Sequence, residues 1–260
     1  MKEFKIRASG SGKIMSGTVG LTEKQKIELT GLKLRSVLTL TQSKKQNELE
    51  YKKTNPVLPQ GAKTYVEIWL KEQLYSRRQE MSSKYCDKGN VVEDDSLDFI
   101  GKMLSLGIVM KNDIEFENEY CTGTPDAILN DFIIDAKNPW DCFTFPLFDD
   151  TCPNDDYFYQ AQCYMWLKKM QSYKLIYVLS NTPEHLIKKE FYYYAKANGY
   201  DLDDVDAWNK IHDYHTYDNV DDKLKIKVFN IKRDDNVIKD IETRVLMCRK
   251  YVKELLTKIK

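Results

Sequence analysis

The fold is decided by the stretch from Gly123 to Lys137, which reads Gly-Thr-Pro-Asp-Ala-Ile-Leu-Asn-Asp-Phe-Ile-Ile-Asp-Ala-Lys. Its second part, from Phe132 to Lys137, is β-branched and apolar enough to form a short strand. Side chains two positions apart in a strand share a face and lie about 6–7 Å apart. We therefore expect Asp135 and Lys137 to point the same way.

The first part of the stretch supplies a second carboxylate. Asp126 opens a short apolar run, and the following pair Asn130-Asp131 is typical of a hairpin turn. Such a hairpin would bring Asp126 close to Asp135. Carboxylates without His or Cys neighbours favour a hard cation such as Mg²⁺ or Mn²⁺. Lys137 would orient or deprotonate an attacking water, or neutralise charge in the transition state, beside a metal that polarises a phosphoryl oxygen.

The same residues also permit a structural interpretation. Asp126 would then cap a turn, and Asp135 with Lys137 would form a same-face ion pair at the surface. Three apolar residues precede Asp135 on what we expect to be a central strand, where a solvated pair is out of place. The sequence therefore favours a metal-dependent phosphodiesterase site.

This pattern of Gly-x-Pro-Asp, a second Asp nine residues on, and Ala-Lys resembles the PD-(D/E)xK nuclease superfamily. Its details are similar to the branch of phage lambda exonuclease and YqaJ-type recombinases. The resemblance implies an α/β fold with a central mixed β-sheet flanked by helices, which is the restriction-endonuclease-like core. The expected order of helices and strands along the chain indicates the same α/β class.

Two further elements fit the resemblance. The run Gly89-Asn90-Val91-Val92-Glu93 is similar to the family's Gly-x-x-x-Glu element. By itself, this acidic run would be explained by a helix N-terminus that suits the helix dipole, and only the resemblance favours Glu93 as a site residue. Gln160 and Tyr164 share a face of an expected helix and resemble the family's Gln-x-x-x-Tyr element, with Gln162 a second candidate. The resemblance implies metal ligation by Glu93, Asp126, Asp135 and the Ala136 carbonyl, and a catalytic set that also includes Lys137, Gln160 and Tyr164.

The N-terminal segment is a third such element. In lambda-type exonucleases an Arg and a Ser near the N-terminus grip the 5′-phosphate, and Arg7 with Ser9 resembles that pair. The alternative is that Ser9 simply caps a helix.

The rest of the chain reads as further helices and strands. We expect a helix pair within 21–60, helices over 62–78, from 89, from 157 and over 234–260, and strands over 113–120, 173–180, 188–194 and 224–231. A fourth acid at the site would come from Glu115, Glu117 or Glu119, among which the sequence does not choose.

The segment from Asn138 to Tyr159 follows the motif and holds three prolines and several aromatic residues, so we expect a loop beside the site. Its rings would either stack on bases or pack down to anchor the loop. For most of them we expect the second role.

Composition sets outer limits on function. Forty basic and forty acidic residues cancel, so any DNA contact must come from a local basic patch. We expect a single domain over residues 1–260, and no run is apolar enough to suggest a membrane segment. The six cysteines form no CxxC pair and read as reduced cytoplasmic thiols, without the spacing of an iron–sulfur cluster.

The leading hypothesis is a Mg²⁺-dependent DNA exonuclease, 5′→3′ on double-stranded DNA with a free end, in phage or prophage recombination or repair, with Mn²⁺ as a substitute. A structure-selective endonuclease on the same core is the first alternative. A catalytically inactive DNA-binding recombination partner is the second. The resemblance also admits a single-strand annealing protein as a partner, and both monomers and homo-oligomers.

Overall fold

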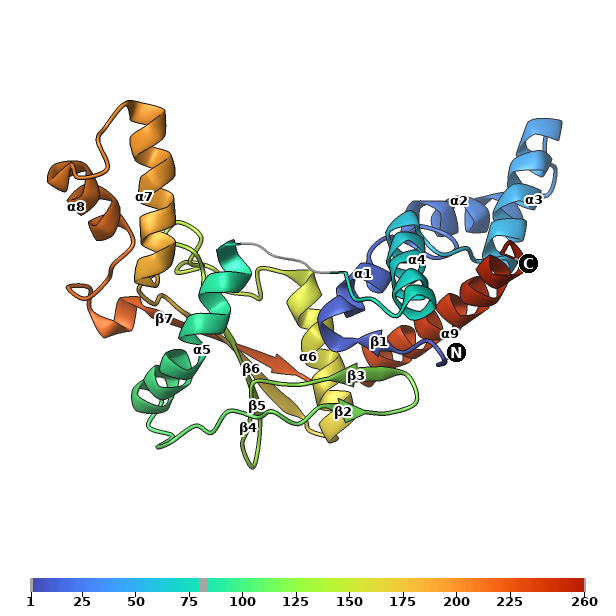
Figure 1. The fold of residues 1–260 in the computed structure, drawn as a ribbon. Coiled ribbons are helices and arrows are strands. Elements are labelled where there is room, and N and C mark those ends of the chain that lie inside the picture. Colours follow the sequence, from blue (N-terminus) through green and yellow to red (C-terminus); the bar gives the residue numbers. More distant parts are fainter. Residues whose placement is uncertain (1, 80–83, 260) are drawn as a thin grey trace.

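A mixed four-stranded sheet lies at the centre of the molecule, in the order β4-β5-β6-β7 (Figure 1). The computed structural model describes residues 2–79 and 84–259. β4 and β5 pair antiparallel, β5 and β6 parallel, and β6 and β7 antiparallel. The expected α/β class with a central mixed sheet is confirmed. The strands are β4 (Ala127–Ile128), β5 (Ile133–Lys137), β6 (Ser172–Val178) and β7 (Ile226–Lys232).

The two faces of this sheet are covered by different helices. Ile133 and Leu175 belong to the larger core cluster, which includes residues of α6 (Asp155–Lys168). Ile134 and Ile176 belong to a second cluster with residues of α5 (Lys84–Met103). Because side chains alternate along a strand, Asp135 shares the face of Ile133 and looks toward α6.

A smaller sheet connects the N-terminus to the site. It has the order β1-β3-β2 and consists of β1 (Ile6–Arg7), β2 (Phe116–Glu117) and β3 (Cys121–Gly123). The expected strand over 113–120 is thus much shorter than predicted. The Asn118 side chain accepts hydrogen bonds from the N–H groups of Tyr120 and Cys121, each over 2.8 Å, and this turn ends the strand.

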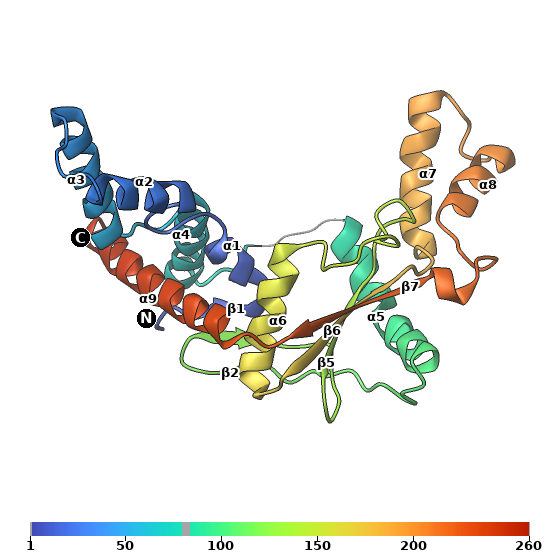
Figure 2. The same cartoon turned by 180° about the vertical axis from the view of Figure 1, so that it is seen from behind.

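The N-terminal helices and the C-terminal helix pack together on one side of the sheet (Figures 1 and 2). Their bounds are η1 (Ala8–Gly10), α1 (Ser11–Met15), α2 (Glu23–Lys33), α3 (Leu40–Thr54), α4 (Gln60–Tyr75) and α9 (Asp235–Thr257). Reciprocal capping boxes at Thr22 and Thr39 begin α2 and α3. The predicted helix pair, the helix at 62–78 and the amphipathic C-terminal helix are confirmed.

The prediction of a strand over 188–194 is wrong. These residues lie in α7 (Glu184–Asn198), which packs against α8 (Val205–Tyr214); η2 (Asp222–Leu224) follows. Ile187, Phe191 and Ala195 recur every fourth residue and are buried, so helical periodicity outweighs the strand preference of the neighbouring tyrosines. Gly199 ends the helix with a φ of +73°.

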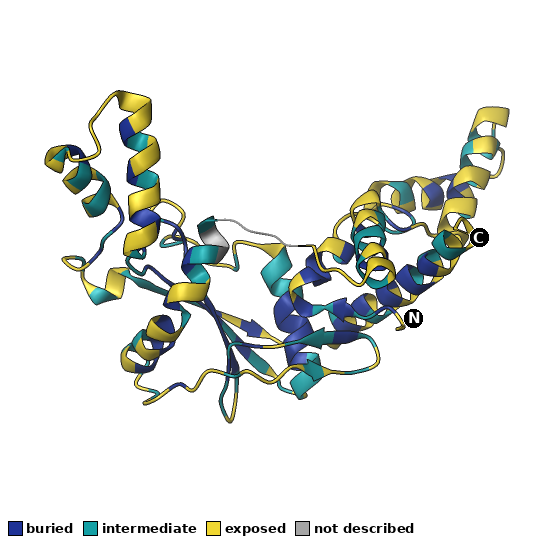
Figure 3. Cartoon of the chain, in the orientation of Figure 1, coloured by how far each residue is buried: buried dark blue, intermediate teal, exposed yellow. Residues whose placement is uncertain are grey.

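Two arms rise from the same side of the sheet at its opposite ends: α2 with α3, and α7 with α8 (Figures 1 and 2). Each arm has a small buried cluster of its own and is largely exposed elsewhere (Figure 3). The N-terminal ends of α5 and α6 lie between the arms. Among the described residues, no helix has the length and apolar character to cross a membrane.

Candidate active site

The hairpin of β4 and β5 brings the two expected carboxylates together. Ala127 pairs with Ile134, so Asp126 lies across from Asp135 at the next position of the ladder. Asp126 Oδ2 accepts a hydrogen bond of 2.7 Å from the N–H of Ala136. Asp135 is only 1% exposed. The structure therefore holds two carboxylates side by side, and one of them is fully buried.

Lys137 completes the group that the sequence predicts. Its Nζ forms an ion pair with Asp135 Oδ2 and lies 5.0 Å from the ring centre of Tyr157. Burial, and then repulsion by Asp135, raise the pKa of Asp126. Burial alone would lower the pKa of Lys137, but Asp135 and Asp126 outweigh it and raise that pKa. Lys137 is accordingly an ammonium that partly offsets two crowded carboxylates.

Helix α6 supports Asp135 from the opposite side. Gln160 Nε2 lies 3.4 Å from Asp135 Oδ1 and 3.1 Å from the Tyr164 hydroxyl, which in turn donates to the Thr124 carbonyl over 3.0 Å. Asn154 caps this helix by accepting from Asp156 N. The expected shared face of Gln160 and Tyr164 is thus confirmed, and it links α6 to both ends of the motif.

Gln162 is directed elsewhere. Its amide donates to the Lys232 carbonyl over 2.9 Å and accepts from Asp234 N over 2.8 Å. These bonds join α6 to the connection between β7 and α9. Of the two glutamines that the sequence offers, only Gln160 reaches the carboxylates.

Gly123 permits the close approach of α6 to the motif. A Cβ atom at this position would lie 2.6 Å from a ring carbon of Tyr164 and 2.8 Å from the Cβ of Ala8. The first residue of the Gly-x-Pro-Asp element is therefore required by packing.

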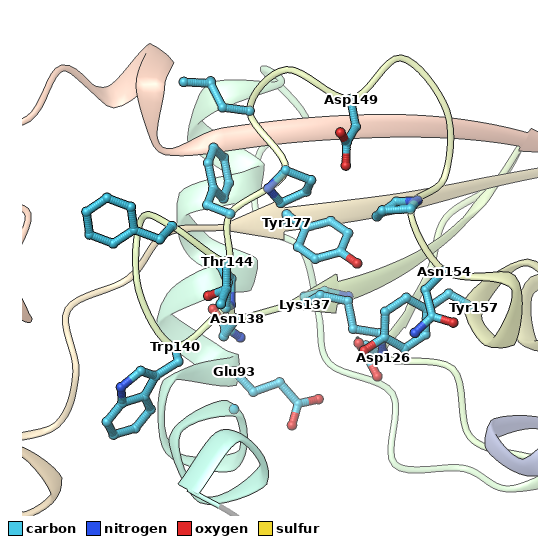
Figure 4. Close-up of a pocket in the computed structure, with 18 of the residues that line it drawn as sticks. Glu93, Asp126, Lys137, Asn138, Trp140, Thr144, Asp149, Asn154, Tyr157 and Tyr177 are labelled. Carbon is cyan, nitrogen blue, oxygen red and sulfur yellow. The ribbon is translucent and has the colours of Figure 1, made fainter. Parts of the chain in front are cut away.

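A cavity of about 760 Å³ opens beside these residues. Asp126, Ala136 and Lys137 line it at one side, and Glu93 approaches from α5 (Figure 4). The long loop after β5 and the ring of Tyr177 form other parts of the wall. Asp135 lies behind this wall and does not line the cavity.

Glu93 is held away from a tight carboxylate triad. Its Oε2 accepts from Lys111 Nζ over 3.0 Å, and Lys111 also lies 3.5 Å from Asp94 Oδ1. Glu93 comes from the helix on the far face of the sheet and enters the cavity around the end of β5. Within residues 2–79 and 84–259 there is no group of three or more His, Cys, Asp or Glu side chains arranged to hold a metal ion.

The pair Asp126 and Asp135 nevertheless fits a hard cation. Asp135 Oδ2 is buried, and among the described residues the Lys137 ammonium forms its ion pair. The donors are all oxygens, which suits Mg²⁺ or Mn²⁺. Glu93, once released by Lys111, and the Ala136 carbonyl would be the further oxygen donors within the site.

The expected 5′-phosphate residues lie outside the cavity lining. Arg7 Nη2 forms a hydrogen-bonded ion pair of 2.6 Å with Glu72 of α4. Ser9 is exposed on η1, and neither it nor its neighbour Ser11 caps α1 with a side chain. The hydroxyl of Ser11 instead donates to the Ala8 carbonyl over 2.7 Å. The structure thus gives Arg7 a protein partner and leaves Ser9 open to solvent.

None of the three acids proposed for a fourth site position lines the cavity. Glu117 pairs with Lys5 over 2.9 Å, Glu119 lies 3.6 Å from Arg249, and Glu115 is exposed.

Lys111 and Asn112 were missed by sequence reasoning. Asn112 N donates to the Asp126 carbonyl over 2.7 Å, and its side chain donates to the Pro125 carbonyl over 2.9 Å. One short segment thus fixes the backbone at Asp126 and the side chain of Glu93. No local pattern marks these two residues, because their role depends on an isolated pairing of Lys111 with Ala127.

Solved structures of other proteins share this architecture over nearly the whole chain. A phage-related exonuclease from Haemophilus somnus 129PT matches with a TM-score of 0.70 at 24% identity, covering 100% of this chain and 98% of that one. The chain has the fold of that exonuclease. An alkaline exonuclease from Laribacter hongkongensis, LHK-Exo, matches with a TM-score of 0.55 at 12% identity, over 98% of this chain and 95% of that one. LHK-Exo in complex with dAMP matches with a TM-score of 0.53 at 14% identity and the same coverage.

The resemblance drawn from the motif is therefore confirmed at the level of the fold. No family model matches the sequence, and no curated protein matches it.

Proposed function

We propose that the protein is a Mg²⁺-dependent DNA exonuclease, with Mn²⁺ as a substitute, that degrades double-stranded DNA 5′→3′ from a free end in phage or prophage recombination or repair. The observation that carries this proposal is the group of Asp126 and Lys137 at the wall of a cavity of about 760 Å³, with Asp135 buried directly behind them. Pockets that bind small ligands usually have volumes of about 300–1,000 Å³, and this cavity lies within that range.

The fold supports the same reaction class. The three solved structures described above, which each match over 98% or more of the chain, are exonucleases by their descriptions, and one of them contains dAMP. A nucleoside monophosphate is the product that an exonuclease releases. This likeness supports DNA as the substrate class.

Each residue has a role that follows from its position. Asp126 and Asp135, with Glu93 and the Ala136 carbonyl, would hold the cation, which when bound would act as a Lewis acid on the scissile phosphate. Lys137 is the cationic side chain at the cavity wall and would bind the phosphate or orient the attacking water. Gln160 contacts Asp135 from α6, and Tyr164 positions Gln160 by accepting its other amide hydrogen bond.

The 5′→3′ polarity rests on the N-terminal segment. Ser9 is solvent-exposed on η1, which packs beside β3 and α6, the elements that carry Gly123 and Tyr164. Arg7 would have to leave Glu72 to bind a terminal phosphate with Ser9. A 5′-phosphate is the ligand we propose for this pair.

The test compares DNA with and without ends. Purified protein should shorten linear duplex DNA in Mg²⁺ or Mn²⁺ but not in EDTA, and it should leave covalently closed circles intact. Cleavage of circles would favour the structure-selective endonuclease, which would use the same residues. A 5′-phosphorylated end should be degraded faster than a 5′-hydroxyl end.

Lys137→Ala supplies the residue-level test. It should abolish degradation while the urea unfolding transition stays cooperative. Lys174→Ala is the matched control, because Lys174 is also a strand lysine but bonds to Asn230 and does not line the cavity. Full activity of Lys137→Ala would refute the role of this lysine. Salt-dependent DNA binding without cleavage under any divalent ion would favour the catalytically inactive recombination partner.

Association is a further part of the proposal. A single-strand annealing protein is the partner that a recombination exonuclease would require, since resection exposes single strands. Light scattering of the purified protein would distinguish a monomer from a homo-oligomer.

A further inference from the structure

The loop after β5 presents two phenylalanines to solvent at the rim of the cavity. Phe143 is 77% exposed and Phe148 is 90% exposed, yet both line the cavity. Trp140 and Phe145 in the same loop are buried, as the sequence predicts for most of its rings. Two large apolar rings left in water beside a proposed active site call for an explanation.

Both rings stand on hydrogen-bonded turns. Phe143 lies in a turn in which Asp141 Oδ1 accepts from Phe143 N over 3.1 Å and from Thr144 N over 2.9 Å. Phe148 lies in a turn closed by Asp149 N and the Pro146 carbonyl over 3.3 Å. In each case the ring occupies the third position of a four-residue turn, from which it projects outward.

The backbone within these turns, and directly before the first of them, is tied to the rest of the protein. Lys88 donates to the Trp140 carbonyl and Lys227 to the Leu147 carbonyl, each over 3.1 Å. The N–H of Cys142 donates to the Tyr217 hydroxyl over 3.1 Å. The loop is therefore fixed in place, and its two exposed rings are held out by a fixed backbone.

Charge at the cavity does not favour a phosphate at this rim. Among the described residues that line the cavity, Lys137 is the one cation, whereas Glu93, Asp126 and Asp149 are acidic. Asp149 directly follows Phe148 in the chain. The Lys227 ammonium on the Leu147 carbonyl partly offsets Asp149, so charge alone does not draw a phosphate to Phe148, whereas its exposed ring suits a neutral, flat group.

Phe143 already uses one face in a protein contact. Its ring stacks on Tyr214 of α8 with centroids 6.0 Å apart and planes at 28°. Tyr214 is itself 48% exposed, so the pair forms an aromatic platform at the base of the α7–α8 arm. Such platforms bind nucleobases of any sequence, because every base has a π-face.

We propose that Phe143 and Phe148 stack on unpaired nucleobases of the DNA strand that enters the cavity. This inference rests on the proposed function, and it adds that the substrate presents bases without partners at this point, as a single strand or a frayed duplex end does. Phosphates of that strand face Lys137, and bases face the aromatic rim.

The experiment measures stacking without cleavage. Short single-stranded oligonucleotides carrying 2-aminopurine at successive positions are titrated with protein in EDTA, and again with Ca²⁺. One or two adjacent positions should show quenched fluorescence. Phe148→Ala should weaken binding about 5- to 150-fold and remove the quench. Phe148→Leu, which keeps an apolar side chain without a π-face, should not restore the quench.

A cycle with abasic DNA makes the assignment specific. Removing the base at the quenched position should cost wild-type protein the same affinity that Phe148→Ala loses, and should cost that variant nothing more. Tyr51→Ala is the control, because Tyr51 is 70% exposed on α3 and does not line the cavity. Phe143→Ala should give the same pattern at a neighbouring base.

Two results would overturn the inference. One is equal affinity of wild type and both Phe→Ala variants, and the other is an equal loss from the variants whether or not the base is present. Stacking in a protein that cleaves no DNA would refute the proposed nuclease and leave the base site standing. Cleavage with no base-dependent binding would do the reverse.

Discussion

Replacing Lys88 by methionine should change how stability depends on pH. The Lys88 side chain is fully buried in α5. Its ammonium donates to the Trp140 carbonyl over 3.1 Å. Burial lowers the pKa of Lys88 from 10.5 to about 8, and the charge of Asp141 opposes this only in part. The difference between these two pKa values means that burying the charged lysine lowers the free energy of unfolding by about 3 kcal/mol, relative to burying the neutral amine.

The sign follows from proton binding. Between about pH 8 and pH 10.5, Lys88 is neutral in the folded protein and protonated in the unfolded chain, so stability rises with pH in this window. Below pH 8 both states are protonated, and the folded state carries a buried charge. Methionine has no charge to bury, so the advantage of Lys88→Met should shrink by about 3 kcal/mol from pH 7 to pH 10.5.

The absolute difference at neutral pH will be smaller than this. Without Lys88, the buried hydrogen bond to the Trp140 carbonyl is lost, which costs about 1–3 kcal/mol. At pH 7 the free energy of unfolding of the variant should therefore exceed that of wild type by about 0–2 kcal/mol. Near pH 10.5 the variant should be less stable than wild type.

Urea unfolding at a series of pH values measures both curves. Lys102→Met is the control, since Lys102 lies on the same helix but is exposed and pairs with Asp222. The difference for that control should change far less over the same window, because an exposed lysine carries no burial penalty. Parallel curves for Lys88→Met and wild type would refute the argument from burial.

Three further changes probe the site itself. Asp126→Asn removes one of two adjacent carboxylates, so it should raise the melting temperature of the protein in EDTA. The same variant should lose both its activity and its stabilisation by Mg²⁺. A lower melting temperature in EDTA would contradict the argument from charge repulsion. Lys111→Gln removes the ion-pair partner of Glu93, so titration with Mn²⁺ should show that the variant binds this ion about fivefold more tightly than wild type. Weaker binding of Mn²⁺ by the variant would show instead that Lys111 positions Glu93. Gly123→Ala forces a methyl group against a packed ring, so urea unfolding should show a loss of about 1–3 kcal/mol, and an unchanged midpoint would contradict the close packing.

The local part of the site was predictable because its geometry is short-range. A two-residue spacing places Asp135 and Lys137 on one face of a strand, and a hairpin turn returns Asp126 to them. The four-residue spacing of Gln160 and Tyr164 fixes their shared helix face in the same way.

The errors arise where two local signals compete. Tyr192, Tyr193 and Tyr194 prefer strands, but the buried positions around them have the period of a helix, and packing against α8 decides the outcome. That helical period is present in the sequence at Ile187, Phe191 and Ala195, and it is the stronger of the two signals. The exposed state of Phe143 and Phe148 had no local signal, because it depends on turns whose anchors, Lys88 and Lys227, come from distant parts of the chain.

The burial of Asp135 separates the two interpretations of the motif. A surface ion pair with Lys137 would leave both groups hydrated, whereas Asp135 is 1% exposed and has a second carboxylate across the ladder. Buried charges of this kind contribute little net stability, since the desolvation penalty offsets their attraction, and a like charge nearby makes the balance worse. A core built for stability alone would be better served by apolar side chains at these positions. The arrangement is explained if its charges serve a cation and a phosphate, which is the chemistry that the proposed nuclease performs.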